Sequence, residues 1–196
     1  GVVVAQHGGG VDTFIQGIVD RLAGEGFAAI APELYHRDTP DDPTEGMARI
    51  GRLRDDRIIR DMNAARDYLA SQPSVHADRI GVTGFCMGGR VAYLMAESDQ
   101  QYRASVVFYG AFIFVPWGEG PAPIDRTSQI TCPVLGLFGD DDQNPTPEQV
   151  SQMQVQLAAH NIPHAFHSYP GSGHAFMVQN APSYRSDAAI DAWERT

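Results

Sequence analysis

The chain has 196 residues, 43% of them apolar, which suits one domain with a single hydrophobic core over residues 1–196. Its formal net charge of −10 argues against binding to nucleic acid or an anionic membrane surface, since both need clustered Lys and Arg. No segment reaches the roughly 20 apolar residues of a membrane span.

The amino-terminal part reads as strand, helix and strand. A short β-branched run at residues 2–5 predicts a buried parallel strand, and the glycine-rich loop 6–10 follows it directly. Bare backbone amides in such a loop can face a cavity, although a flexible turn is the alternative reading. Apolar residues at helical spacing predict a helix over 14–22, and residues 27–31 predict a second strand.

The segment after the second predicted strand is rich in Pro and Asp and predicts a loop at residues 38–44. Open α/β sheets build their sites from loops that follow the carboxyl ends of strands. Nearby polar side chains are therefore candidates for substrate contact, with a solvated charged surface as the alternative for most of the arginines: Tyr35, Arg37, Arg49, Arg52 and Arg54.

A helix is predicted at residues 58–69, and the next strand, 80–83, leads into Gly84-x-Cys86-x-Gly88. This spacing repeats the G-x-S-x-G nucleophile elbow with sulfur in place of oxygen. The two glycines are needed because a strand that turns straight into a helix leaves no room for side chains there. A helix starting at Met87 would direct its positive end toward Cys86 and favour the thiolate. The alternative is that Cys86 is a small buried hydrophobic residue.

The carboxyl-terminal half continues the alternation, with strands predicted at 104–109, 133–138 and 164–169 and a helix at 150–159. The long connection 112–131 carries Phe114 and Trp117, which either cap a pocket or pack in the core. Asp140–Asp142 follow one strand, where a carboxylate could orient an imidazole, lie in a solvated turn or cap a helix. A metal site is disfavoured because the Ca²⁺ loop spacing is absent. His174 follows the last strand behind Gly-Ser-Gly.

The two cysteines, Cys86 and Cys132, stand in unrelated contexts, which argues against a disulfide framework and predicts a reducing, cytoplasmic location. The sequence opens inside an apolar run and ends in a helical pattern at Thr196. We therefore expect the natural protein to continue beyond both ends.

Nucleophile, acid and histidine occur in that chain order, each directly after a predicted strand. This is the order of the α/β-hydrolases and differs from those of chymotrypsin and subtilisin. We predict an α/β protein with the α/β-hydrolase fold: a mostly parallel central sheet with helices on both faces, in a three-layer sandwich. The expected oxyanion donors are the N–H of Gly8 and the N–H of Met87.

The chain resembles the dienelactone hydrolase (carboxymethylenebutenolidase) family along nearly its whole length. The resemblance rests on P-E-L-Y at 32–35, G-F-C-M-G-G at 84–89, C-P-V-L-G-L-F-G-D-D-D at 132–142, G-H-A-F at 173–176 and the terminal A-W-E-R-T. It implies a triad of Cys86, Asp142 and His174, with Asp142 preferred to Asp141 because the family's acid stands third after the glycine. It implies hydrolysis of a small ester or lactone through a thioester, with neither metal nor organic cofactor.

Two positions depart from this family. His7 stands where members often carry a glutamate that helps to control the protonation of the cysteine. Val178 stands where dienelactone-cleaving members have an arginine for the substrate carboxylate, which argues against dienelactone as the substrate. Candidates for substrate binding or thiol tuning are His7, Tyr35, Phe114, Trp117 and Phe176.

The predicted partner is a small-molecule ester or lactone, bound by a monomer or small homo-oligomer, with no nucleic acid or membrane involved. Two other functions are compatible with the sequence. One is a general carboxylesterase or thioesterase of the same fold, favoured by the H-G-G-G loop at residues 7–10. The other is a hydrolase-fold protein that binds a ligand without turnover, which a complete triad argues against.

Overall fold

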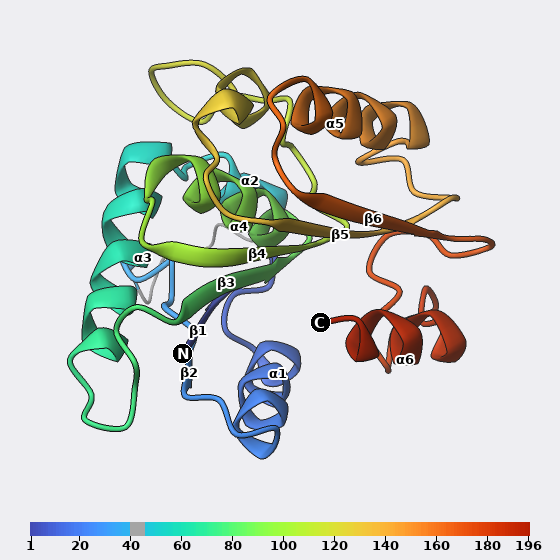
Figure 1. Cartoon of the computed structure of the whole chain (residues 1–196). Helices are drawn as coiled ribbons and strands as arrows, with labels where there is room; N and C mark the ends of the chain where they lie inside the picture. The colour runs from blue at the N-terminus through green and yellow to red at the C-terminus, as the bar shows by residue number, and fades with distance from the viewer. Residues whose placement is uncertain (40–45) are drawn as a thin grey trace.

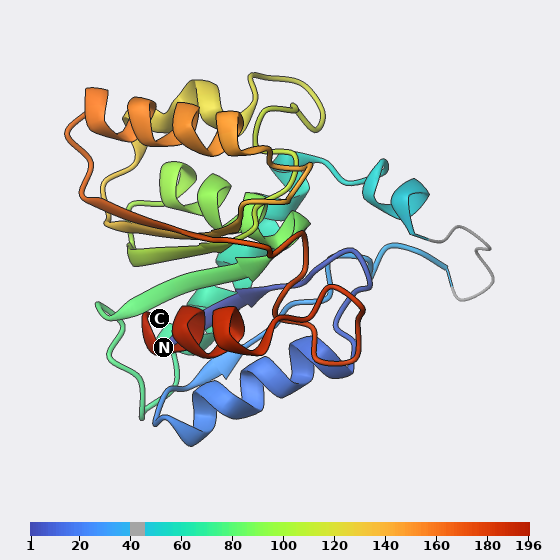
Figure 2. The ribbon, with the colours of Figure 1, turned by 90° about the vertical axis from the view of Figure 1, so that its right-hand side faces the viewer.

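The computed structural model describes residues 1–39 and 46–196. Within them the sheet has six strands in the order β2-β1-β3-β4-β5-β6, and every pair is parallel. Figure 2 shows the strands running in one direction, so that their carboxyl ends meet at one edge. The strands are β1 Val2–Ala5, β2 Ala29–Ile30, β3 Ile80–Phe85, β4 Tyr102–Phe108, β5 Val134–Gly139 and β6 His164–Tyr169.

Helices cover both faces of the sheet, so the predicted three-layer α/β fold is confirmed (Figure 1). One face carries α3, α4 and α5, and the other carries α1 and α6. Two short helices, α2 and the 3₁₀ helix η1, lie in connections. Their bounds are α1 Thr13–Gly24, α2 Met47–Ile50, α3 Asp55–Ala70, α4 Met87–Ser98, η1 Pro123–Gln129, α5 Pro147–Ala159 and α6 Ser186–Glu194.

The core is divided into two clusters because successive side chains of a strand point to opposite faces of the sheet. In β1, Val3 packs with the cluster under α3, α4 and α5, whereas Val4 packs with the cluster under α1 and α6. Strands that are buried on both faces explain the unbroken apolar runs in the sequence.

The element boundaries differ from the predicted ones mainly at the sheet edge. The strand predicted at 27–31 shortens to Ala29–Ile30, where β2 is an edge strand and Phe27 is 49% exposed. The elbow strand extends beyond its predicted end to Phe85. Of the loop predicted at 38–44, residues 40–44 lie outside the described residues. No helix in the described ranges is long and apolar enough to cross a membrane.

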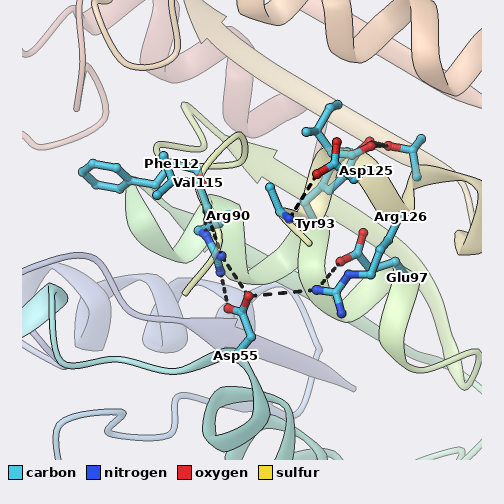
Figure 3. A network of polar contacts seen from close by, with 11 residues as sticks. Asp55, Arg90, Tyr93, Glu97, Phe112, Val115, Asp125 and Arg126 are labelled. Carbon is cyan, nitrogen blue, oxygen red and sulfur yellow. Dashed lines mark hydrogen bonds and ion pairs between the residues drawn. The ribbon is translucent and has the colours of Figure 1, made fainter. Parts of the chain in front are cut away.

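A buried ion cluster joins α3 and α4 to the connection that follows β4 (Figure 3). Arg90 is completely buried and donates two hydrogen bonds to Asp55, at 2.6 and 3.0 Å. It also donates to the carbonyl groups of Phe112 and Val115, and its guanidinium lies 4.0 Å from the centre of the Trp117 ring. This full set of partners is what allows a charge to remain inside the protein.

Glu97 extends the same cluster on α4. Its side chain is fully buried, and Oε1 lies 2.9 Å from Nη2 of Arg126, which in turn lies 4.0 Å from Asp55 (Figure 3). Burial raises the pKa of Glu97 to about 8, although Arg126 and Arg90 act to lower it. The native protein therefore keeps a proton on this carboxyl that the unfolded chain releases above pH 4.5.

We expect the free energy of unfolding to fall as the pH rises from 4.5 to about 8, because the native state binds more protons than the unfolded chain in that window. Glu97→Gln removes this carboxyl and should flatten the dependence, which urea denaturation across the window would measure. The exposed Glu25→Gln variant is the matched control. The decisive range is pH 4.5 to 6.5, below the titration of His174, and an unchanged slope there in Glu97→Gln would contradict the expectation.

Candidate active site

Cys86 occupies the single residue between β3 and α4, with φ 60° and ψ −122°. A non-glycine residue rarely adopts this left-handed backbone, which costs on the order of 1–3 kcal/mol. Four hydrogen bonds hold it there, one of them from the Arg90 amide to the Cys86 carbonyl at 3.4 Å. Its N–H donates to the Phe108 carbonyl at 3.1 Å, and its carbonyl accepts from the amides of Gly89 and Ala111 at 2.9 and 3.0 Å. The strained elbow that the sequence predicts is therefore present.

The glycines of the elbow have the predicted steric role. A Cβ on Gly84 would fall on the carbonyl group of Gly88, and a Cβ on Gly88 would meet the carbonyl oxygens of Ala5 and Gln6. Because all of these obstacles are backbone atoms, they have no room to move. The tight crossing of β1, β3 and α4 thus requires glycine on both sides of Cys86.

His174 and Asp142 meet from two further strands. The imidazole Nδ1 lies 2.8 Å from Asp142 Oδ2, and Asp142 is only 2% exposed. The other carboxylate oxygen accepts a 2.9 Å hydrogen bond from the N–H of Asn144, whose side-chain oxygen accepts from the Phe112 amide at 3.1 Å. Asp141 is exposed, and His174 bonds to Asp142 instead. Asp142 is therefore the carboxylate that can orient the imidazole.

The surroundings of His174 favour its protonated form. Burial acts to lower its pKa, but the hydrogen bonds and negative charges of Asp142 and Cys86 outweigh burial and raise the pKa to about 10. Tyr109 packs edge-on against the imidazole, with 5.2 Å between ring centres. With Nδ1 committed to Asp142, the remaining ring nitrogen is the one available to the Cys86 sulfur. An imidazolium beside a sulfur atom stabilises the thiolate form.

A cavity of about 300 Å³ opens in front of Cys86. The residues around it come from the loop after β1, helices α1 and α2, the elbow, and the segments that follow β4 and β6. They are His7, Gly8, Phe14, Gly46, Met47, Ile50, Cys86, Tyr109, His174, Ala175 and Val178. The walls are mostly apolar, and the volume suits a small ligand.

A larger cavity of about 680 Å³ lies beside Gly1, Ile80 and Trp193, at the amino ends of the strands. Its described lining residues include neither cysteine nor histidine. Since open α/β sheets bind ligands at the carboxyl ends of their strands, we take the smaller cavity at Cys86 as the candidate active site. In the described ranges, no group of three or more His, Cys, Asp and Glu side chains is arranged to hold a metal ion.

The amides of Gly8 and Met87 flank Cys86 in the fold, and neither donates a hydrogen bond to another described residue. Tyr35 lies behind them and does not line the cavity. Its hydroxyl donates to the Gly8 carbonyl at 3.1 Å and lies 3.5 Å from the Met87 sulfur. Tyr35 is 3% exposed. Instead of the predicted contact with substrate, its side chain contacts Gly8 and Met87 from behind.

His7 lines the cavity and contacts Asp12, the residue that caps the amino terminus of α1. Nε2 lies 2.8 Å from Asp12 Oδ2, and the ring packs edge-on against Phe14. The other oxygen of Asp12 accepts from the amides that open α1, at Phe14 and Ile15. The imidazole thus faces a carboxylate that is itself fixed by the helix terminus.

Three predicted substrate-binding aromatics are not brought to the cavity. Phe176 is fully buried between Tyr109 and Tyr169, with ring centres 5.2 Å from each. Trp117 covers the guanidinium of Arg90, whose charge is attracted to the face of the indole ring. Phe114 is half-buried and packs against the same core cluster. Core packing, the alternative for the last two, is what the structure shows.

The arginines near the predicted loop pair with neighbouring groups. Arg37 binds Asp61 through two hydrogen bonds at 2.6 and 2.7 Å. Arg49 binds Asp38 at 3.0 Å, and Arg52 lies 3.2 Å from the same carboxylate. Arg54 donates to two backbone carbonyl groups. None of them lines the cavity at Cys86.

Sequence reasoning missed six lining residues, namely Phe14, Gly46, Met47, Ile50, Tyr109 and Ala175. Tyr109 was open to prediction, because it follows β4 directly, at the same edge of the sheet as Cys86. The others carry no chemical signal in the sequence and reach the site only through packing.

A parallel sheet with a thiol at a strand-to-helix elbow, and a buried carboxylate paired with a histidine after later strands, defines an α/β-hydrolase. A sequence model of the dienelactone hydrolase family matches residues 1–196, and the chain belongs to that family. Membership makes the protein a hydrolase.

Individual relatives agree with this assignment. The chain is 36% identical to a protein of Salmonella typhimurium named "Putative carboxymethylenebutenolidase", over 99% of the chain and 74% of the relative. It is also 36% identical to an Escherichia coli protein of the same name, over 99% of the chain and 73% of the relative. A crystal structure described as "Putative Dienelactone Hydrolase", from Klebsiella pneumoniae, superposes with a TM-score of 0.89 at 33% identity, covering 99% and 83% of the two chains.

Proposed function

We propose that the protein hydrolyses a small ester or lactone, with Cys86 as nucleophile, His174 as acid and base, and Asp142 as the group that orients His174. The observation that carries this proposal is the 2.8 Å hydrogen bond from His174 to a carboxylate that is 2% exposed, beside a thiol held at the elbow. A buried carboxylate fixes the tautomer and direction of the imidazole, which is the role of the acid in a catalytic triad.

In the first half of the reaction, the sulfur of Cys86 attacks the carbonyl carbon while His174 carries the proton that the thiol gives up. A C–S bond forms, and the carbonyl electrons move to the oxygen, which the N–H groups of Gly8 and Met87 receive. One such donor is typically worth about 10²–10³ in rate. When the oxyanion collapses, the C–O bond breaks, the leaving alkoxide takes the proton from His174, and an acyl thioester remains on Cys86.

In the second half, His174 accepts a proton from water as the water oxygen attacks the thioester. The C–S bond breaks, the carboxylic acid leaves, and the proton taken from water stays on His174 beside the released sulfur. General acid and base assistance of this kind contributes about 10²–10⁴. Besides substrate and water, the steps use Gly8, Cys86 and His174, which line the cavity, and the amide of Met87, which follows Cys86. The balance of atoms requires no cofactor.

The thioester predicts a covalent adduct that can be isolated. Acid quenching during turnover of a p-nitrophenyl ester should give a protein whose intact mass is raised by one acyl group, and peptide mapping should locate the group on Cys86. Cys132 should stay unmodified, because it is 4% exposed and burial raises the pKa of its thiol to about 11. Steady hydrolysis with the acyl group mapped to any other residue would contradict the mechanism.

A general carboxylesterase or thioesterase activity is the second candidate, and the mostly apolar cavity favours it. A panel of lactones, aryl esters and acyl thioesters separates the two by their kcat/KM values. The third function considered from the sequence, ligand binding without turnover, does not fit membership of a hydrolase family.

A further inference from the structure

The position of every basic side chain relative to the cavity can be stated. The sequence contains 14 Lys and Arg residues in total, and all of them are arginine. All lie in the described ranges, because residues 40–45 contain no basic side chain. None of the 14 lines the cavity at Cys86. The only other cations available there are the imidazolium forms of His7 and His174.

The arginine nearest to the cavity along the chain is turned away from it. Met47 and Ile50 of α2 line the cavity, whereas the guanidinium of Arg49 lies 3.9 Å from the centre of the Tyr35 ring and binds Asp38. The positive charge of Arg49 is therefore paired with Asp38 and does not face the cavity. This arrangement leaves apolar side chains on the cavity wall.

Both imidazoles at the cavity already face a carboxylate. His7 lies 2.8 Å from Asp12, and His174 lies 2.8 Å from Asp142. Tyr109, the other titratable wall residue besides Cys86, stays neutral because burial raises the pKa of its hydroxyl well above its ordinary value. The described lining therefore offers no cation that lacks an anionic partner, and the chain as a whole carries −10.

A carboxylate bound in this cavity would lose water without gaining a counter-ion, which is strongly unfavourable. An apolar group would instead contact Phe14, Met47, Ile50 and Val178. We propose that the site selects neutral esters or lactones with an apolar acyl group and discriminates against substrates that carry a carboxylate. This inference rests on the proposed function and adds the class of substrate.

Val178 is the residue at which this selectivity can be changed. It follows His174 in the same loop, is half-buried, and its N–H donates to the Ala175 carbonyl at 3.0 Å. Together with Phe14 it also borders a neighbouring cavity of about 760 Å³, so a longer side chain has space beside it. An arginine here would bring a cation to the wall of the cavity.

The test compares the p-nitrophenyl monoester of adipic acid with its methyl ester. The two share the leaving group and acyl length and differ in one distal charge, and release of nitrophenolate reports the same bond in both. We expect wild-type kcat/KM to be at least about tenfold higher for the methyl ester. The distal carboxylate of the monoester would lose its hydration in the cavity without gaining a counter-ion, which is unfavourable. Intact-mass detection of the Cys86 acyl adduct accompanies each assay.

Variants at Val178 and at an exposed control position test whether the cavity causes the preference for the methyl ester. Val178→Arg should reduce the preference for the methyl ester at least about fivefold, and added NaCl should weaken that gain because salt screens the new charge. Val178→Gln changes length without charge and should keep the wild-type preference. Val155→Arg adds the same charge on α5, at a side chain that is 62% exposed, and should also leave it unchanged.

The outcomes separate the two proposals. If wild type hydrolyses the monoanion as well as the methyl ester, with the adduct on Cys86, the selectivity inference is wrong and the thioester mechanism stands. If neither substrate yields nitrophenolate or an adduct, both proposals fail. Because the wild-type comparison needs no variant, misfolding of Val178→Arg does not remove the test.

Discussion

Cys86→Ala is expected to lower kcat/KM for p-nitrophenyl esters by at least about 10⁴-fold, because loss of the nucleophile removes the covalent route entirely. Residual hydrolysis would come from substrate binding and from the amides of Gly8 and Met87 alone. The fold should tolerate the change, since Ala is smaller than Cys and its small side chain keeps the backbone of the elbow. The measurement is nitrophenolate release under saturating and limiting substrate, together with circular dichroism.

Cys132→Ala is the matched control for that experiment. This second thiol is buried among core residues at the start of β5, and burial raises its pKa to about 11. The variant should keep near wild-type turnover, and iodoacetamide should inactivate both it and wild type through Cys86. Near-normal hydrolysis by Cys86→Ala would end the assignment of the nucleophile.

Asp142→Asn is expected to reduce kcat by about 10³–10⁴-fold, because the amide cannot hold the His174 ring with its other nitrogen directed at the Cys86 sulfur. The same change should lower the pKa of His174 from about 10, since Asp142 contributes a hydrogen bond and a charge that raise it. Imidazole proton shifts followed by NMR against pH give this second readout, which a merely structural defect would not produce.

Asp141→Asn provides the matched control, one position away in the same turn. Asp141 is exposed, whereas Asp142 is 2% exposed and bonded to His174. We expect Asp141→Asn to keep turnover and the His174 titration within about twofold of wild type, as surface substitutions usually do. If the two variants lost activity equally, the carboxylate of the site would need a different assignment.

Much of the fold could be predicted because its signals are local. Apolar runs such as residues 2–5 and 134–139 and the helical spacing over 58–69 follow from which faces of each segment are buried. The glycine pattern around Cys86 reflects a collision between adjacent backbones that any residue with a Cβ would cause. The chain order of Cys86, Asp142 and His174 placed all three at one edge, since the carboxyl ends of parallel strands coincide.

Other features depended on contacts between segments far apart in the chain. Asp142 differs from Asp141 in being buried. A run of three successive aspartates in the sequence does not indicate which of them is buried. Trp117 covers the guanidinium of Arg90, and Tyr35 supports the loop at Gly8, although each had been a candidate for substrate contact.

The elbow at Cys86 could be predicted from the sequence because strand and turn preferences act over a few neighbouring residues. The character of the cavity depends on which side chains the packed helices and loops leave facing it. Met47 and Val178 line the same cavity although they lie far apart in the sequence, and Arg49 turns away from it. Periodicity within one segment carries no information on such distant neighbours, so tertiary packing alone sets the polarity around Cys86.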